Sequence, residues 1–100
     1  MTKKDVVERI SRLRTSVGLS ARELSLKIGK NDAYINRLES KRSFEPSVSS
    51  LLAIIEACES TPAEFFYYDM AEYKADKEII ELLKNANETK KRIVIETLKL

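Results

Sequence analysis

Few residues in this chain are suited to catalysis or to binding a metal. It has no histidine and one cysteine, Cys58. Without histidine, neither a Ser-His-Asp nor a Cys-His arrangement can form. One thiolate and scattered carboxylates do not make up a zinc site. Gly18 and Gly29 each stand alone, so the sequence has no glycine-rich phosphate loop. We therefore expect that the protein is not an enzyme and has no cofactor and no metal site. We interpret Cys58 as a small buried hydrophobic residue.

The residues best suited to specific recognition lie between positions 32 and 38. Ile35 and Leu38 are three residues apart, as on the buried side of a helix covering about residues 32–38. Arginine fits the O6 and N7 atoms of guanine, asparagine fits adenine, and a carboxylate accepts from the N4 amino group of cytosine. The outer side of this helix therefore has groups that can read base edges. It carries Asp32, Ala33, Asn36 and Arg37.

A second short helix must precede this one and hold it in place. Ser20 and Glu23 form a capping box that begins it at Ala21. Gly29 can end it, because glycine tolerates the left-handed backbone that a sharp exit needs. Asn31 is a good N-cap for the helix that follows. Isolated helices under about 12 to 15 residues are marginal in water, so both must be packed by neighbours.

Several residues at fixed spacing carry a resemblance to a known family. They are Gly18-Leu19-Ser20, Glu23-Leu24, Ile28-Gly29, Ile35 and Glu39, then Pro46-Ser47, Leu51-Leu52 and Thr61-Pro62-Ala63-Glu64-Phe65-Phe66. Over roughly residues 6–66 the chain resembles the phage-repressor class of helix-turn-helix domains, the Cro/repressor or XRE family. The resemblance implies an all-α fold, a five-helix phage-repressor-like domain whose third helix lies in the DNA major groove.

The resemblance also implies roles for individual residues. The readout positions are Asp32, Ala33, Asn36 and Arg37. The residues that we expect at the DNA backbone are Ser20, Ala21, Arg22, Asn31, Tyr34, Lys41 and Arg42. Free N–H groups and the helix dipole attract phosphates to a helix N-terminus, and Lys41 and Arg42 lie in the polar loop after the recognition helix. Ala21 departs from the family pattern, which often has a glutamine there that touches the backbone.

The first helix is predicted to cover about residues 3–17. Its apolar residues recur at steps of four, three and four, which is typical of an amphipathic helix. They are Val6, Ile10, Leu13 and Val17. The resemblance places Arg14 opposite Glu39 at the end of the recognition helix, as a partly buried structural pair, with Gly29 structural as well. Removing one partner of a buried pair costs about 3 to 5 kcal/mol, which we expect for Glu39→Ala.

Two further helices should complete this domain. Ser47 caps the fourth, whose predicted core residues are Val48, Leu51, Leu52, Ile55 and Cys58. Thr61 and Glu64 form a capping box that opens the fifth helix, with Pro62 at its first position. We expect this helix to bring Phe65 and Phe66 into the core.

Charge is distributed unevenly along the chain. Residues 1–45 have 11 Lys and Arg against six acids, a net +5, whereas residues 46–73 have five acids and no basic residue. Residues 74–100 carry a net +2. A basic pole at the end with the recognition helix would orient the domain toward a polyanion. Ordinary solvated helix faces are the alternative explanation.

Residues 69–100 form an extension beyond the domain of residues 1–68. Two amphipathic helices are predicted in it, separated by a break at Asn85-Ala86-Asn87. The apolar side of the first is formed by Ile79, Ile80, Leu82 and Leu83, and the second is lined by Ile93, Val94, Thr97, Leu98 and Leu100. These faces must be buried on their own domain or on a second copy. We favour a homodimer through residues 74–100, because operators of this protein class resemble palindromes read by two-fold dimers.

We therefore expect a sequence-specific DNA-binding transcriptional regulator, in the role of a repressor, that reads a palindromic double-stranded operator as a dimer. The alternative is a protein-interaction module that keeps the helix-turn-helix fold but has lost operator binding. The longest apolar run, Leu51 to Ile55, is far short of the roughly 20 residues of a membrane span. The N-terminus lacks the apolar core of a signal peptide, so we expect a cytoplasmic protein without a membrane partner. No small-molecule effector is inferred.

Overall fold

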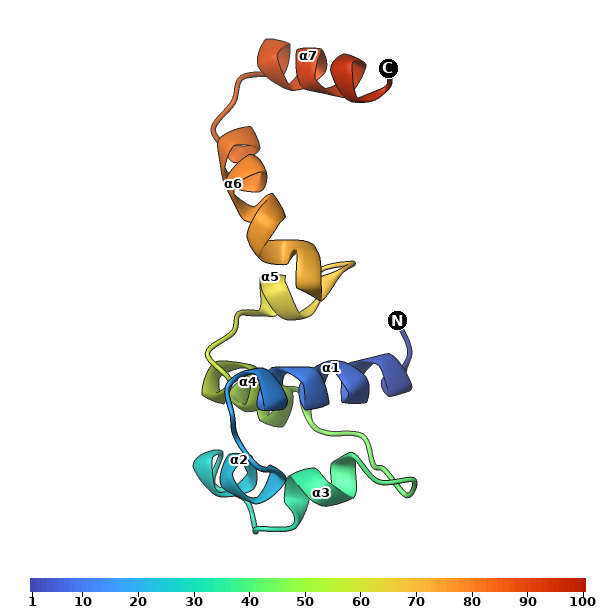
Figure 1. Ribbon diagram of the computed structural model, residues 1–100, viewed down its shortest axis with the longest axis vertical. Helices are drawn as coiled ribbons and strands as arrows, with labels where there is room; N and C mark the ends of the chain where they lie inside the picture. Colours follow the sequence, from blue (N-terminus) through green and yellow to red (C-terminus); the bar gives the residue numbers. More distant parts are fainter. The chain divides into compact units, whose positions relative to one another are not determined.

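The computed structural model describes all 100 residues, and every regular element in it is helical (Figure 1). The α-helices are α1 (Lys3–Ser16), α2 (Ala21–Lys27), α3 (Tyr34–Leu38), α4 (Val48–Ala57), α5 (Pro62–Phe65), α6 (Tyr73–Lys84) and α7 (Glu88–Leu98). A 3-10 helix, η1 (Met70–Glu72), precedes α6. The predicted all-α fold is confirmed. None of the helices combines the length and the apolar character that crossing a membrane requires.

The contacts divide the chain into two compact units, Met1–Phe66 and Tyr67–Leu100. The division falls slightly before the boundary expected after residue 68. The reason is that Tyr67 interacts with α6. Its hydroxyl donates to Asp76 Oδ2 at 2.8 Å, and its ring meets Tyr73 edge-on with the centroids 5.3 Å apart.

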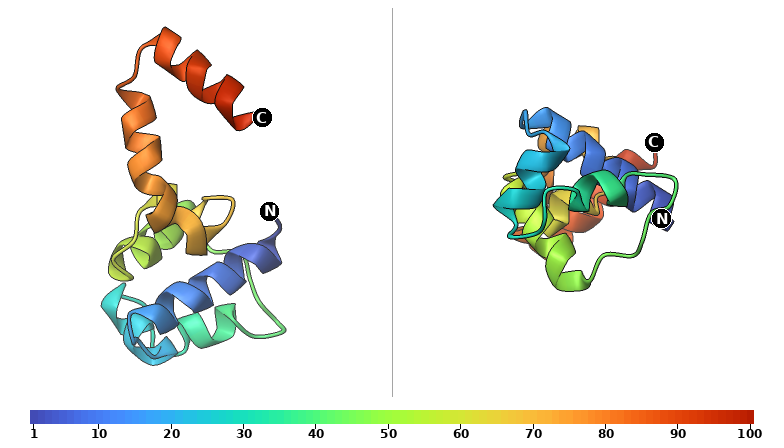
Figure 2. Two further views of the ribbon diagram at one scale, coloured as in Figure 1. Left: turned by 45° about the horizontal axis from the view of Figure 1, so that its top comes forward. Right: turned by 90° about the horizontal axis from the view of Figure 1, so that it is seen from below.

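The first unit has one apolar core to which all five of its helices contribute. α4 contacts α1, α2 and α5, and α2 contacts α3. The buried apolar residues are Ile10, Leu13, Leu24, Ile35, Leu38, Ile54, Ile55, Cys58 and Phe65. Burial also raises the pKa of the Cys58 thiol, as expected of a cysteine in an apolar core. This core fixes α2 and α3 against α1 and α4 (Figure 2).

The buried side of α4 differs from the predicted one. Val48 and Leu52 are exposed, and Ser50 and Ile54 are buried in their place. Ser50 can be buried because its hydroxyl lies 2.9 Å from that of Ser47, the N-cap, so its polar atom has a partner. The prediction of Val48 and Leu52 as core residues was therefore wrong.

The beginning of α5 follows the prediction only in part. Thr61 accepts from the Glu64 N–H at 3.2 Å, but the Glu64 carboxylate accepts from the Ser60 hydroxyl at 3.0 Å rather than completing a capping box. Phe65 is fully buried, whereas Phe66 is about half exposed. Phe66 is the C-cap of this four-residue helix, and its ring packs edge-on against Phe65 from outside, with the centroids 4.9 Å apart. Its predicted place in the core was wrong.

Three helices of the first unit end in the same hydrogen-bond pattern, the Schellman motif. The residue after the C-cap has a positive φ in each: 75° at Gly18, 75° at Gly29 and 59° at Glu59. Glycine adopts this angle without strain, but a side chain does not. Glu59 is thus the one strained helix end among the three.

The second unit consists of η1, α6 and α7, joined at the expected break. Asn87 caps α7 and accepts from the Lys90 N–H at 2.8 Å. Neither α6 nor α7 contains a buried residue. The large apolar residues that remain exposed on them and at the chain end are Ile79, Leu82, Ile93, Ile95, Leu98 and Leu100. This unit therefore leaves most of its apolar surface uncovered.

Candidate nucleic-acid interface

The expected recognition helix, α3, begins later than the sequence suggested. It starts at Tyr34, with Ala33 as an N-cap that makes no side-chain bond. Asn31, predicted as the N-cap, instead accepts from the Ala33 N–H at 3.1 Å. Asparagine readily bonds its own backbone two residues on, which forms a turn in competition with the helix. Asp32 therefore lies in the turn before α3 and not within the helix.

Ser25 joins α2 to the start of α3. Its side chain is fully buried, and its hydroxyl donates to the Ala21 carbonyl at 2.7 Å while accepting from the Ile35 N–H at 2.9 Å. The first N–H groups of a helix have no partner within it, so this bond satisfies one of them. Sequence reasoning missed this role, because no local pattern links residues 25 and 35.

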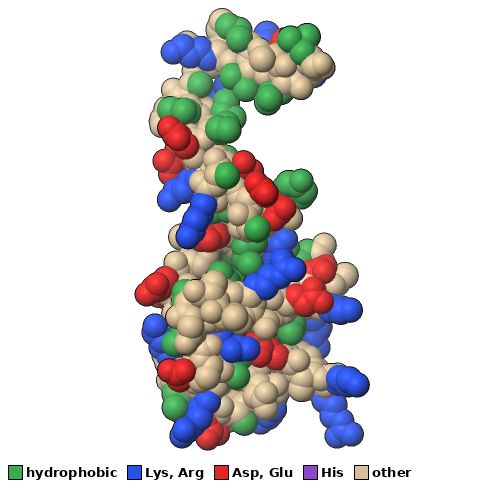
Figure 3. Space-filling model, viewed as in Figure 1, with side chains coloured by type: hydrophobic (Ala, Val, Ile, Leu, Met, Phe, Trp, Pro, Cys, Tyr) green, Lys and Arg blue, Asp and Glu red, His purple; other side chains and the backbone are tan.

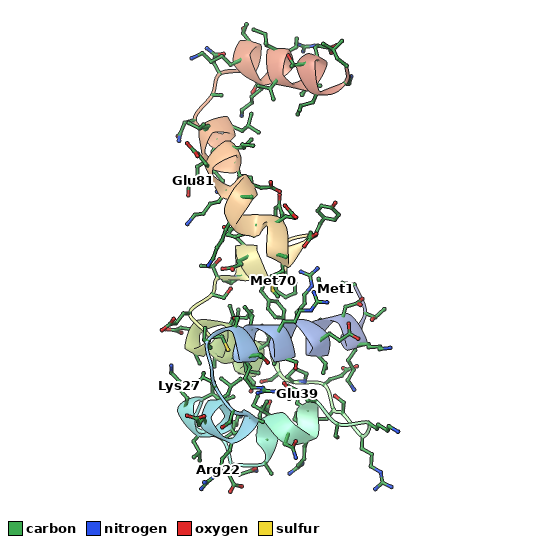
Figure 4. All side chains as sticks on the ribbon, in the orientation of Figure 1. Met1, Arg22, Lys27, Glu39, Met70 and Glu81 are labelled. Atoms are coloured by element: carbon green, nitrogen blue, oxygen red, sulfur yellow. The ribbon has the colours of Figure 1, made fainter.

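Arg14 and Glu39 fix the other end of α3 to α1. Arg14 donates from Nε to Glu39 Oε1 at 3.1 Å and from Nη2 to Oε2 at 3.0 Å, and its Nη1 also donates to the Leu19 carbonyl at 3.0 Å. The two side chains are 19% and 16% exposed. Figure 4 shows Glu39 between the two helices. This two-point contact fixes the orientation of the C-terminal end of α3 relative to α1.

The four expected readout residues take three different positions. Asn36 and Arg37 lie together on the outer side of α3, both exposed and without a side-chain partner. Ala33 is half-buried at the N-cap. Asp32 is exposed but forms an ion pair with Arg22 of α2, with 3.7 Å between Oδ2 and Nε.

The N-terminus of α2 already has a carboxylate beside it. The Glu23 N–H donates to Ser20 Oγ and the Ser20 N–H donates to Glu23 Oε1, each at 3.0 Å, as the capping box predicts. The bond from the Ser20 N–H is the main reason why the pKa of Glu23 is lowered. The N–H groups of Ala21 and Arg22 make no bond within the chain. They are the ones available to an incoming anion.

Tyr34 is held between two neighbours that the sequence did not point to. Its ring packs edge-on against Phe44, with 5.1 Å between the centroids, and Lys30 Nζ lies 5.3 Å from the ring centroid. A cation over an aromatic face is attracted by the ring's negative charge density. Tyr34 thereby connects the turn before α3 to the loop after it.

The loop after α3 carries two free cations, Lys41 and Arg42, both exposed. Lys3 Nζ donates to the Ser43 carbonyl at 3.1 Å and ties this loop to α1. The helix ends without a left-handed residue, because Lys41 has a negative φ and the Ser40 hydroxyl caps the Arg37 carbonyl at 2.7 Å. A glycine is therefore not needed to end this helix.

The charges on this end of the first unit are mostly positive. Lys and Arg side chains, blue in Figure 3, project around α2, α3 and the following loop. Arg22 reaches outward from α2, away from the core (Figure 4). Three of the acids on the same end are already engaged: Glu23 in its capping box, Asp32 with Arg22 and Glu39 with Arg14. Glu45, in the loop after α3, is exposed. No group of three or more side chains suits a metal ion.

Comparison with known protein families gives a match over most of the first unit. A family model described as Helix-turn-helix matches residues 10–65 of the chain. The matched segment runs from the first buried residue, Ile10, to the last, Phe65, and includes both α2 and α3. Neither the curated proteins nor the solved structures gave a match.

Proposed function

Because the chain belongs to the Cro/repressor (XRE-type) helix-turn-helix family, whose members are DNA-binding regulators, we propose that it is a sequence-specific transcriptional regulator. It reads a palindromic operator as a dimer, with α3 in the major groove of each half-site. A dimer seated on an operator blocks access of the transcription machinery, so we assign the protein the role of a repressor.

One observation carries this proposal: the outer side of α3 presents two hydrogen-bonding side chains that nothing in the protein uses. Asn36 and Arg37 are exposed and have no partner within the chain. Asparagine matches adenine and arginine matches guanine in the major groove. Ala33 stands at the start of the same face, where a methyl group suits the methyl of thymine.

Phosphate contacts fix the position of the helix on the duplex. We assign these contacts to residues that surround α3 on the same end of the unit. They are Ser20, Ala21, Arg22, Asn31, Tyr34, Lys41 and Arg42. Arg22, Lys41 and Arg42 supply charge, and the free N–H groups of Ala21 and Arg22 supply directed donors.

We assign dimerisation to the second unit. α6 has 12 residues and α7 has 11, lengths at which an isolated helix is marginal in water. Neither buries a residue within the chain, and their exposed isoleucines and leucines match what an interface between copies covers. Residues 1–68 would then bind DNA, and residues 74–100 would join two copies.

Selection of bound sequences from a random duplex library tests the readout. We expect the wild-type protein to recover a palindrome, and Asn36→Ala and Arg37→Ala each to relax the preference at one base pair per half-site. Arg12→Ala is the matched control, because Arg12 is an exposed arginine of α1 outside the proposed contacts. Recovery of no sequence at all would favour the alternative, an interaction module that has lost operator binding.

Salt dependence tests the phosphate contacts. If two subunits neutralise about 6 phosphates, log K falls against log salt with a slope of about −5. Lys41→Gln and Arg42→Gln should each make the slope shallower and weaken all sequences equally. A slope near zero for the wild-type protein contradicts the proposed phosphate contacts.

Sedimentation tests the dimer. We expect the full chain to sediment as a dimer and residues 1–70 as a monomer. A charge placed on the exposed face, Leu82→Asp, should also yield a monomer without removing any segment. Equal assembly states for all three proteins would exclude dimerisation through the extension.

A further inference from the structure

The ion pair between Arg22 and Asp32 links the two helices of the helix-turn-helix at its outer surface. The Arg22 Nε and Asp32 Oδ2 atoms are 3.7 Å apart, and the two side chains are 72% and 61% exposed. Arg22 is in the first turn of α2, and Asp32 is in the turn before α3. Both residues lie on the surface that we propose to contact DNA.

The geometry of the pair leaves the arginine free to bind something else. A separation of 3.7 Å is an ion pair and not a hydrogen bond, and Arg22 donates no side-chain hydrogen bond within the chain. All five guanidinium N–H groups therefore remain available. Such a planar fork matches the oxygens of a phosphate, which it can contact at two points.

The same geometry makes Asp32 poorly suited to read a base. A carboxylate can accept only from the amino groups that bases present in the major groove, chiefly the N4 group of cytosine, and to reach one Asp32 would have to leave Arg22. The freed carboxylate would then repel the phosphates that the guanidinium attracts. If Asp32 stays beside Arg22, its charge is compensated and the arginine is restrained near the backbone of the duplex.

We propose that Asp32 is a positioning residue that acts through Arg22, holding the guanidinium toward a DNA phosphate, and that it does not read a base. This inference rests on the proposed function. It changes the assignment of one residue, because the readout then belongs to Asn36 and Arg37, with Ala33 beside them.

The test compares four proteins on one operator, recovered beforehand with the wild-type protein: wild type, Asp32→Asn, Arg22→Gln and the double variant. Affinities are measured for the operator and for each of its single base-pair changes, at one salt concentration. Both side chains are exposed, so the variants should fold, and circular dichroism checks this. Asn36→Ala serves as the comparison for a residue that reads a base.

With Arg22 present, we expect Asp32→Asn to weaken every sequence by a similar factor of about 2 to 5, the range for an exposed ion pair. With Arg22→Gln, we expect Asp32→Asn to strengthen binding, because only the repulsion of phosphates is then removed. Asn36→Ala should act at one base pair and equally in both backgrounds.

Two results would overturn the inference. Relaxed preference at one base pair on Asp32→Asn identifies Asp32 as a reader of bases. Equal effects of Asp32→Asn with and without Arg22 show that the two residues are not coupled. Failure of the proposed function looks different, since the wild-type protein then recovers no operator, and the positioning role falls with it.

Discussion

The two units of this protein have similar apolar content and very different interiors. The first, Met1–Phe66, has 27 apolar residues among 66, and the second, Tyr67–Leu100, has 16 among 34. Nine apolar residues are buried in the first unit and none in the second. Composition therefore does not decide burial in this chain.

What differs is the number of helices that can enclose a side chain. In the first unit, α4 is surrounded by α1, α2 and α5, so its apolar residues are covered from several sides. The second unit has only two α-helices, of 12 and 11 residues, beside the 3-10 helix η1. A small unit buries a smaller fraction of its surface, and below about 40 residues a chain usually needs outside support.

The difference in burial between the two units is tested most strongly by replacing one leucine with alanine in each. Leu38 is 0% exposed and Leu82 is 65% exposed. We expect Leu38→Ala to lower the free energy of unfolding by about 2 to 5 kcal/mol, because it removes buried contacts and leaves a cavity. Leu82→Ala should change it by less than about 0.5 kcal/mol. Urea denaturation followed by circular dichroism at low protein concentration measures both, and equal losses would remove the distinction.

The ion pairs of the first unit offer a second comparison, between a partly buried pair and an exposed one. We expect Glu39→Ala to cost about 2 to 3 kcal/mol, somewhat below the value for a fully buried pair, because Arg14 and Glu39 keep some contact with water. Asp32→Asn should cost less than about 1 kcal/mol, since its partner Arg22 is exposed. Thermal unfolding of both variants checks this, and a Glu39→Ala loss no larger than that of Asp32→Asn would contradict it.

The strained end of α4 leads us to predict a substitution that stabilises the protein. Glu59 has a φ of 59°, where Gly18 and Gly29 have 75°. Replacing Glu59 with glycine should relieve the left-handed strain and raise the free energy of unfolding by about 1 kcal/mol. Gly29→Ala is the matched control: a Cβ there meets no atom within 4 Å, so its expected loss of about 1 kcal/mol is purely conformational. A destabilised Glu59→Gly variant would refute this explanation.

The smallest expected effect compares charged and neutral side chains at the helix N-termini. Asp5 and Glu23 accept N–H bonds that lower their pKa values, whereas α7 is capped by the neutral Asn87. A lowered pKa stabilises the fold above the ordinary value, which is 4.5 for Glu23, and this contribution is lost as the pH falls through the pKa of the folded state. The difference in stability between wild type and Glu23→Gln should therefore shrink between about pH 5 and pH 3. A constant difference would contradict the capping role of the charge.

Local sequence determined where most helices begin and end. Ser20, Ser47 and Asn87 each cap the helix predicted to follow them, and Gly18 and Gly29 end two helices. A cap is a bond between residues two or three positions apart, so it can be read without knowing the fold. The box of Thr2 and Asp5 at the start of α1 was missed, because aspartate stands where glutamate or glutamine is usual.

Only the tertiary structure decided which faces are covered and which polar groups meet. It buried Ser50 and Ile54 instead of Val48 and Leu52, and it brought Ser25 to Ile35 and Asp32 to Arg22. These outcomes depend on which helices lie against one another. Residues 10 positions apart in the chain share no periodicity from which their contact could be predicted. The residues proposed to contact DNA could therefore be named from their types, whereas the contacts of Ser25 with Ile35 and of Asp32 with Arg22 were set by the packing of α2 against α3.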